Sequence, residues 1–159
     1  MSKHSHLQYG DIDPIALDNE LGMERYLDEG ALDPRLVLLV KVRTAELNGC
    51  SYCRAMYADQ ALAMGESPGR LDVLQTWADS PGFFSAREQA ALAFAESLHA
   101  HGECSVPKPV WHDASLAFEE REVVDLLIVI SSINGWSLLE SSTHHPTENP
   151  PASVCESTA

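Results

Sequence analysis

Helix-starting and helix-ending residues recur along this chain at intervals that suit a series of helices. Asp33-Pro34 has the form of a helix start, because an N-cap aspartate precedes a proline at the first helical position. Asn48-Gly49 ends the helix that follows. Ser85 and Glu88 form a capping box in front of an amphipathic stretch. These signals predict an all-α fold.

The segment from Val123 to Leu139 is the one ambiguous element. Its first eight residues are rich in Val and Ile and would also suit a buried strand. We prefer a helix, because the segment has a charged first turn and no partner strand is evident elsewhere. The other expected helices cover residues 19–29, 34–47, 50–64, 68–77, 85–98 and 111–118.

One domain is expected for a chain of 159 residues with 45% hydrophobic residues. We place it at residues 19–142, between a polar N-terminal segment at 1–18 and a flexible tail at 143–159. The 24 acidic and 10 basic side chains leave a net charge of −14, which argues against nucleic acid or an anionic membrane as a partner. No apolar run reaches the ~18 residues of a membrane span, and no secretory signal precedes the domain. A cytoplasmic location is therefore expected.

Cys50 and Cys53 form a Cys-X-X-Cys pair at the start of a helical segment. Two thiols at i and i+3 on a first turn lie side by side and form or open a disulfide with little backbone movement. The helix N-terminus favours thiolate over thiol. The alternatives are two buried small hydrophobic residues or half of a metal site, but no second pair of ligands is found at zinc-site spacing. A redox centre without metal or cofactor is therefore the preferred interpretation.

Three stretches resemble the carboxymuconolactone decarboxylase superfamily, specifically its alkyl hydroperoxidase D-like branch. They are Val42-Arg-Thr-Ala-Glu-Leu-Asn-Gly-Cys-Ser-Tyr-Cys53, the stretch from Phe84 to Leu92, and Ile133-Asn-Gly-Trp136. The resemblance implies an AhpD-like all-α fold and a homo-oligomer, commonly a trimer or a hexamer. It also implies peroxide reduction through a sulfenic acid and an intramolecular disulfide, which an unknown thiol reductant then opens.

Two positions depart from the pattern of the redox-active branch. The branch has a histidine where this chain has Tyr57, and a glutamate where it has Leu38. The tyrosine hydroxyl ordinarily titrates at about pH 10 and is a poor base at neutral pH, so Tyr57 is expected to donate a hydrogen bond or a proton. Glu46 would supply a carboxylate if it faces inward. The candidate catalytic residues are therefore Cys50, Cys53, Tyr57 and Glu46.

The expected function is peroxiredoxin-type reduction of a small peroxide by the Cys50/Cys53 dithiol. By analogy with the family, Cys53 is attacked first and Cys50 resolves, whereas the helix dipole alone favours Cys50. One alternative is a carboxymuconolactone decarboxylase-like enzyme, which does not depend on the cysteine pair. Another is a non-catalytic family member that senses redox state or binds a small molecule.

Overall fold

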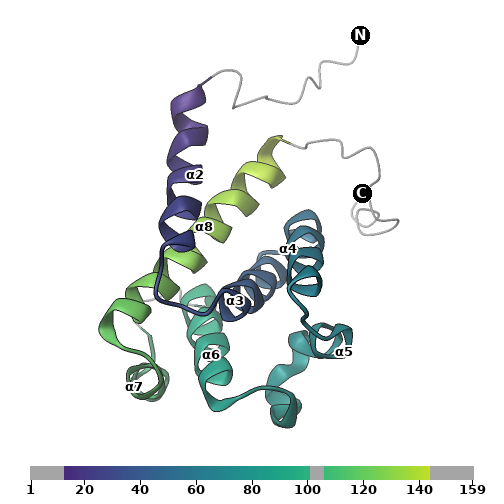
Figure 1. The fold of residues 1–159 in the computed structure, drawn as a ribbon, viewed down its shortest axis with the longest axis vertical. Coiled ribbons are helices and arrows are strands. Elements are labelled where there is room, and N and C mark those ends of the chain that lie inside the picture. Colours follow the sequence, from purple (N-terminus) through teal and green to yellow (C-terminus); the bar gives the residue numbers. More distant parts are fainter. Residues whose placement is uncertain (1–12, 101–105, 144–159) are drawn as a thin grey trace.

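Helix α3, Pro34–Leu47, lies at the centre of the fold in a computed structural model that describes residues 13–100 and 106–143 (Figure 1). Its start follows the sequence signal, because Asp33 Oδ1 accepts hydrogen bonds from the backbone N–H groups of Arg35 and Leu36. The stretch of residues 36–45 is buried without interruption. A helix buried on all sides needs partners around its whole circumference, and the other helices provide them.

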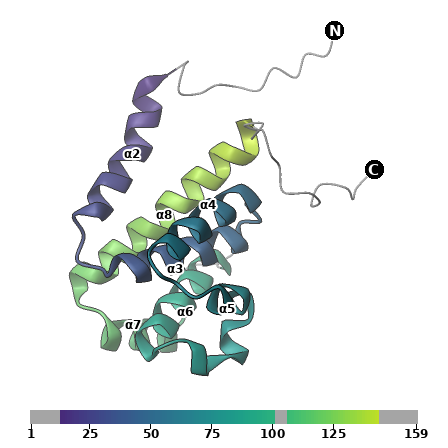
Figure 2. The same cartoon turned by 45° about the vertical axis from the view of Figure 1, so that its right-hand side comes forward.

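The remaining elements surround α3, and the described residues contain no strand. They are α2 (Pro14–Asp28), α4 (Ser51–Ala63), α5 (Pro68–Asp72), the 3₁₀ helices η1 (Leu74–Asp79) and η2 (Pro81–Phe83), α6 (Ala86–Ala100), α7 (Lys108–Ala117) and α8 (Glu120–Thr143). Helix α3 packs on α4, α6 and α8, while α2 lies along α8 in both views (Figures 1 and 2). The all-α prediction is confirmed.

The core consists of two groups of apolar side chains, and α3 contributes to both. Leu36, Val37 and Val40 join one group with residues of α6, α7 and α8. Leu39 and Val42 join the other, which also contains the cysteine helix α4 and η1. Different faces of α3 thus pack into the two groups and connect the half of the core at α6, α7 and α8 to the half that holds the cysteines.

Helix α8 resolves the ambiguity between helix and strand in favour of the helix. It runs over Glu120–Thr143, and by length and composition alone residues 120–142 would suit a membrane span, contrary to the expectation that no apolar stretch is long enough. Leu126, Val129 and Ile133 are fully buried, so one face of α8 packs as a core helix of this fold.

Several boundaries differ from the sequence prediction. Helix α2 begins at Pro14 rather than near residue 19, because Asp13 caps it by accepting from the N–H of Ile15. The expected helix at 68–77 breaks into α5 and η1, with non-helical backbone at Thr76. Helix α7 begins at Lys108 instead of residue 111. Predictions for residues 1–12, for Cys104 and for the tail beyond 143 lie outside the described residues.

Asp125 joins α8 to the connection between α2 and α3. Its Oδ1 accepts from the hydroxyl of Tyr26 at 2.8 Å and from Arg121 Nε at 3.1 Å, and its Oδ2 accepts from Ala31 N–H at 2.9 Å. Burial pushes the pKa of this carboxyl upward, but the N–H of Ala31, the Tyr26 hydroxyl and the Arg121 guanidinium together hold it below its ordinary value of 3.8.

An Asp125→Ala variant is expected to lose about 3 kcal/mol of unfolding free energy, because three donors lose their buried acceptor. The lowered pKa means that the ionised carboxyl stabilises the fold above its unfolded value of 3.8, and that this contribution is lost as the pH falls through the folded value. The unfolding free energy, measured with urea at about pH 6 and about pH 3, should therefore fall less on acidification in the variant than in the parent protein. Asp113→Ala, at an exposed carboxylate, serves as the control; equal acid sensitivity of Asp125→Ala and the parent would contradict the assignment.

Candidate active site

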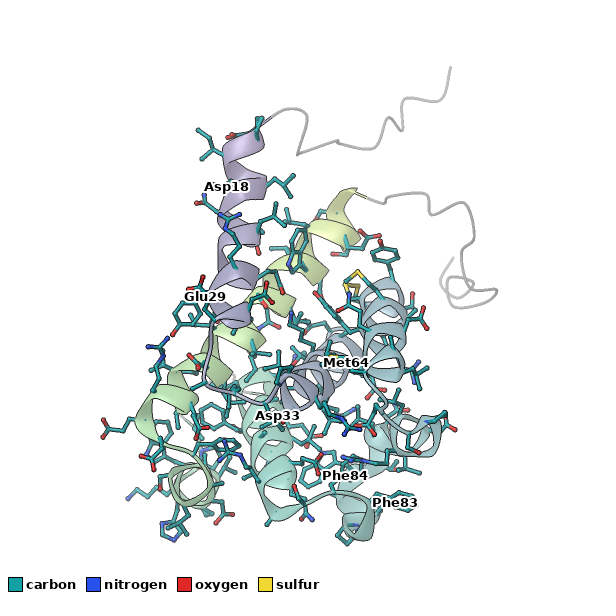
Figure 3. All side chains as sticks on the ribbon, in the orientation of Figure 1. Asp18, Glu29, Asp33, Met64, Phe83 and Phe84 are labelled. Carbon is teal, nitrogen blue, oxygen red and sulfur yellow. A yellow bond between two sulfur atoms is a disulfide. The ribbon has the colours of Figure 1, made fainter. Side chains whose placement is uncertain are left out.

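A disulfide joins Cys50 and Cys53 at the N-terminal end of α4 (Figure 3). Gly49, with φ of +67°, adopts the left-handed conformation that lets the chain turn from α3 into α4. Cys50 is the N-cap residue, and its Sγ accepts from the N–H of Cys53 at 3.2 Å. Cys53 is only 2% exposed, whereas Cys50 is partly exposed. The helix start therefore holds one sulfur inside the protein and the other at its surface.

A short chain of hydrogen bonds ends on the buried sulfur. The Ser137 hydroxyl of α8 lies 3.8 Å from Cys53 Sγ and donates to it. Asn48 Nδ2, at the end of α3, donates to Ser137 Oγ at 3.1 Å and also to Asn134 Oδ1 at 2.9 Å. A donor directed at sulfur stabilises the thiolate relative to the thiol. Residues far apart in sequence thus meet at the reactive atom.

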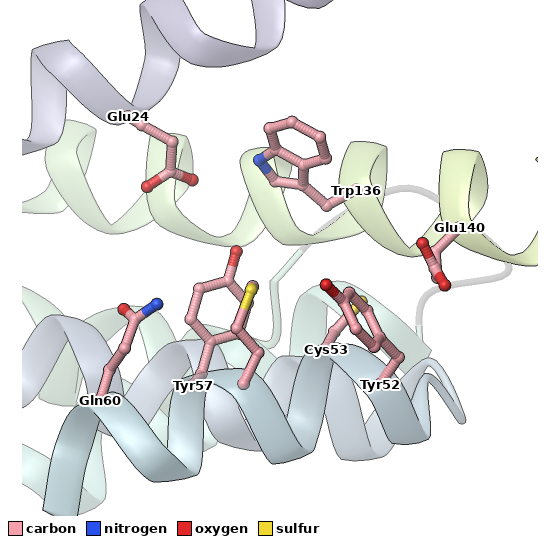
Figure 4. Close-up of a pocket in the computed structure, with 8 residues that line it drawn as sticks. Glu24, Tyr52, Cys53, Tyr57, Gln60, Trp136 and Glu140 are labelled. Carbon is pink, nitrogen blue, oxygen red and sulfur yellow. The ribbon is translucent and has the colours of Figure 1, made fainter. Parts of the chain in front are cut away.

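A cavity of about 360 Å³ opens beside Cys53, between α2, α4 and α8 (Figure 4). Its walls consist of aromatic, carboxylate and amide side chains together with one thioether and the buried sulfur. The lining residues are Glu24, Tyr52, Cys53, Met56, Tyr57, Gln60, Trp136 and Glu140. The volume suits a small organic molecule, and Cys53 is the cysteine that such a molecule would meet.

Tyr57 forms part of this wall and is itself buried. Burial, followed by the negative charge of Glu24, raises the pKa of its hydroxyl far above the usual value. The ammonium group of Lys41 lies over its ring, 5.0 Å from the centroid. The hydroxyl therefore stays protonated and is available as a donor, not as a base.

Two arginines engage the carboxylate of Glu46. Its carboxylate pairs with Arg43 at 3.1 Å and with Arg54 at 3.0 Å, and Glu46 is not among the residues that line the cavity. Leu38 belongs to the buried group that contains Cys53 and Tyr57. The structure thus places Cys50, Cys53 and Tyr57 together, while two arginines hold the Glu46 carboxylate.

The carboxylates of the cavity come from two residues outside the set predicted from sequence. Glu24 reaches it from α2, where its Oε2 pairs with buried Lys41, and its Oε1 is buried without a hydrogen-bond partner among the described residues. Glu140 enters from the last turns of α8. Neither carries a local sequence signal, because each enters the site only through the packing of α2 and α8 around α4. Within the described residues, no group of three or more His, Cys, Asp and Glu side chains could hold a metal ion.

Comparison with known proteins identifies relatives for most of the chain. The model of the carboxymuconolactone decarboxylase family matches residues 16–97. The uncharacterized protein YdfG of Bacillus subtilis (strain 168) is 30% identical over 131 residues, which make up 82% of this chain and 88% of YdfG.

Solved structures share the fold. ATU0492 of Agrobacterium tumefaciens, a protein of unknown function described as a candidate antioxidant defence protein AhpD, superimposes with a TM-score of 0.82 at 23% identity, over 90% of this chain and 99% of that one. The debrominase Bmp8 superimposes with a TM-score of 0.69 at 16% identity, over 79% of this chain and 67% of Bmp8. A cysteine-to-alanine variant of Bmp8 with bound 2,3,4-tribromopyrrole gives a TM-score of 0.69 at 14% identity, over 90% of each chain. At these identities the likeness shows the AhpD-like fold alone.

A Ser137→Ala variant should raise the pKa of the Cys53 thiol in the reduced protein, because the thiolate loses its hydroxyl donor. The measurement is the pH dependence of thiolate absorbance or of alkylation rate in a background where Cys53 is the only cysteine. Ser131→Ala, at an exposed serine on the same helix, should leave the pKa unchanged. An unchanged pKa in Ser137→Ala would remove this serine from the site.

Proposed function

Because the chain belongs to the carboxymuconolactone decarboxylase family, we propose that it is a thiol oxidoreductase of the alkyl hydroperoxidase D type. The observation that carries this proposal is the position of the cysteine pair. Cys53 forms part of the wall of an organic-sized cavity, and Cys50 forms a disulfide with it from the partly exposed side of the helix start.

In the proposed cycle, a hydroperoxide enters the cavity and the Cys53 thiolate attacks its terminal oxygen. The O–O bond breaks, the alcohol leaves with a proton, and Cys53 becomes a sulfenic acid. The Cys50 thiol then attacks the Cys53 sulfur, so that the disulfide forms and water leaves. An external dithiol reduces the disulfide and is itself oxidised; this step does not require the cavity, since Cys50 is partly exposed.

The chemistry needs a thiolate although the chain lacks the histidine and glutamate of the redox-active pattern. We propose that donors to the sulfur replace the missing base. The Ser137 hydroxyl and the N-terminus of α4 both favour the thiolate, with the helix terminus contributing about 0.3–1 kcal/mol. Tyr57, protonated and next to Cys53 in the cavity wall, is suited to protonate the departing alkoxide.

Reductive dehalogenation is a second candidate, because the aromatic walls formed by Tyr52, Tyr57 and Trp136 suit a ring held beside Cys53. Bmp8, with the same fold, is a debrominase that was crystallised with 2,3,4-tribromopyrrole. A dithiol supplies the two electrons: the carbon–bromine bond is replaced by carbon–hydrogen, bromide leaves, and the disulfide forms. The decarboxylase alternative receives less support, since the described residues present two carboxylates and no cationic side chain to an anionic lactone in the cavity.

The central prediction concerns the loss of thiols. Equimolar alkyl hydroperoxide should rapidly remove two thiols per chain from the reduced protein and produce the disulfide between Cys50 and Cys53. Cys53→Ser should abolish the reaction, whereas Cys50→Ser should stop at a sulfenic acid that dimedone traps. Thiol titration and mass spectrometry measure both outcomes. Slow loss confined to Cys155 would instead support a non-catalytic member, and bromide release from 2,3,4-tribromopyrrole without peroxide turnover would support the dehalogenase.

A Tyr57→His variant extends the same experiment. A neutral imidazole at this buried position restores a base, so the rate of reaction with peroxide should rise about tenfold or more. Tyr57→Phe removes the hydroxyl and keeps the ring, and it should be slower than the parent protein. If histidine brings no gain, the proton relay is not what limits this chain.

We further propose that the protein forms a homo-oligomer, a trimer or hexamer, in the cytoplasm. Support comes from the outer face of α8, where exposed positions 124, 127, 131, 134 and 138 follow the three-and-four spacing of a helix-packing stripe. Val124, Leu127 and Leu138 on this stripe are apolar, and Leu138 is 67% exposed. Such a face is typical of a subunit contact.

Light scattering should therefore give a mass three or six times that of the 17.4 kDa chain. Leu138→Glu should lower this mass, because it introduces a charge into the proposed contact. Leu116→Glu alters an exposed leucine on α7, away from that face, and should leave the mass unchanged. A monomeric parent protein would contradict the proposal.

A further inference from the structure

The cavity beside Cys53 has an unbalanced charge. Two carboxylates, those of Glu24 and Glu140, lie among its lining residues, and within residues 13–100 and 106–143 no lysine, arginine or histidine does. The ammonium group of Lys41 lies over the Tyr57 ring and pairs with Glu24. Lys41 itself is buried and does not line the cavity. The Glu140 carboxylate has no ion pair or hydrogen bond within the described part of the chain.

A third carboxyl group, that of Glu20, lies near Glu24 but is not among the residues that line the cavity. It lies one turn before Glu24 on α2, and its Oε2 is buried without a hydrogen-bond partner among the described residues. Burial, followed by the charge of Glu24, raises its pKa. Gly135 of α8 makes room for it, since a Cβ there would lie 2.8 Å from Glu20 Oε2. Glu20 and Glu24 thus lie near each other on α2, and Glu24 is the one that pairs with the ammonium group of Lys41.

The cavity wall also offers aromatic rings to a cation. Tyr52 and Tyr57 line it from α4, and Trp136 lines it from α8 (Figure 4). Aromatic faces attract organic cations through their quadrupoles, and the attraction grows when water is excluded. Glu24 lies at the same wall, and its buried Oε1 accepts no hydrogen bond from the described residues. The charge of this carboxylate would attract a cation in the cavity and repel an anion.

We propose that this cavity selects positively charged organic substrates: an apolar or aromatic body that carries an ammonium-type group directed at Glu140 and Glu24. Neutral molecules rank second and anions last. The proposal rests on the proposed function only in that Cys53 is the reacting sulfur. A cavity of this kind would disfavour substrates that carry a carboxylate, such as fatty acids or lactone acids.

The test measures how charged reagents reach Cys53, without any peroxide. In a Cys50→Ser/Cys104→Ser/Cys155→Ser background, Cys53 is the only thiol of the four cysteines. The probes are trimethylammonioethyl, methyl and sulfonatoethyl methanethiosulfonate, whose thiosulfonate sulfur is attacked by the thiolate with release of methanesulfinate. To correct for the intrinsic reactivity of each reagent, its rate with the folded protein is divided by its rate with the unfolded protein. The cationic reagent should exceed the anionic one by roughly tenfold or more.

Two matched variants separate the cavity from the general charge of the protein. Glu140→Gln and Glu120→Gln each remove one negative charge from α8, but residue 120 lies at the exposed far end of that helix. Glu140→Gln should reduce the ratio of cationic to anionic rates severalfold, and Glu120→Gln should leave it nearly unchanged. Equal effects of the two variants, or a parent ratio near one, would overturn the proposal.

A second measurement uses the unmodified protein, in case the triple variant does not fold. Phenyltrimethylammonium and benzenesulfonate share a ring and differ in charge. The cation should raise the melting temperature in a concentration-dependent manner, and the anion should not. Stabilisation by benzenesulfonate alone would refute the charge preference. Because neither experiment contains a peroxide, a protein that selects cations but consumes no hydroperoxide would refute the proposed function and leave this inference standing.

Discussion

The need to pair two buried cations organises this protein. Lys41 and Arg43 lie in the uninterrupted buried stretch of α3, where an uncompensated charge would cost several kcal/mol. Lys41 pairs with Glu24 of α2, and Arg43 pairs with Glu46 and with Glu96 of α6. The central helix therefore requires acidic side chains from its neighbours at defined positions. Packing of apolar surface supplies most of the attraction between these helices, and the ion pairs select how they are oriented.

The same pairing shapes the site. Glu24 is drawn toward Lys41 and so becomes part of the wall of the cysteine cavity, with one carboxylate oxygen in the ion pair and the other unused. Arg43 and Arg54 hold Glu46 in an ion pair. The carboxylate nearest to the cysteines in sequence is thus engaged in structure, and a carboxylate from a distant helix faces the cavity. The hydrogen bonds to the two sulfurs come from Ser137 of α8, which donates to Cys53, and from the start of α4, where the N–H of Cys53 donates to Cys50.

Local signals predict much of the fold because each helix start is a short-range event. The Asp33 cap and the Ser85–Glu88 capping box both form as expected, with Ser85 N–H donating to Glu88 Oε2 at 2.7 Å. Asp13-Pro14 carries the same signal and starts α2 in the same way, although an Asp-Pro pair also favours a turn. The break near Thr76 has no local signal, because no proline or glycine marks it.

The sequence alone predicts the helices, the cysteine pair at a helix start and the family resemblance, because each depends on residues that are close together in the chain. The side chains that surround the sulfur follow only from the way the helices pack. Ser137, Glu24 and Glu140 reach Cys53 or its cavity because α2 and α8 lie beside α4. That packing depends on the buried charges and apolar faces of several helices at once, and no window of sequence contains it. The cysteines could therefore be found in the sequence, whereas the charge of the cavity they face could not.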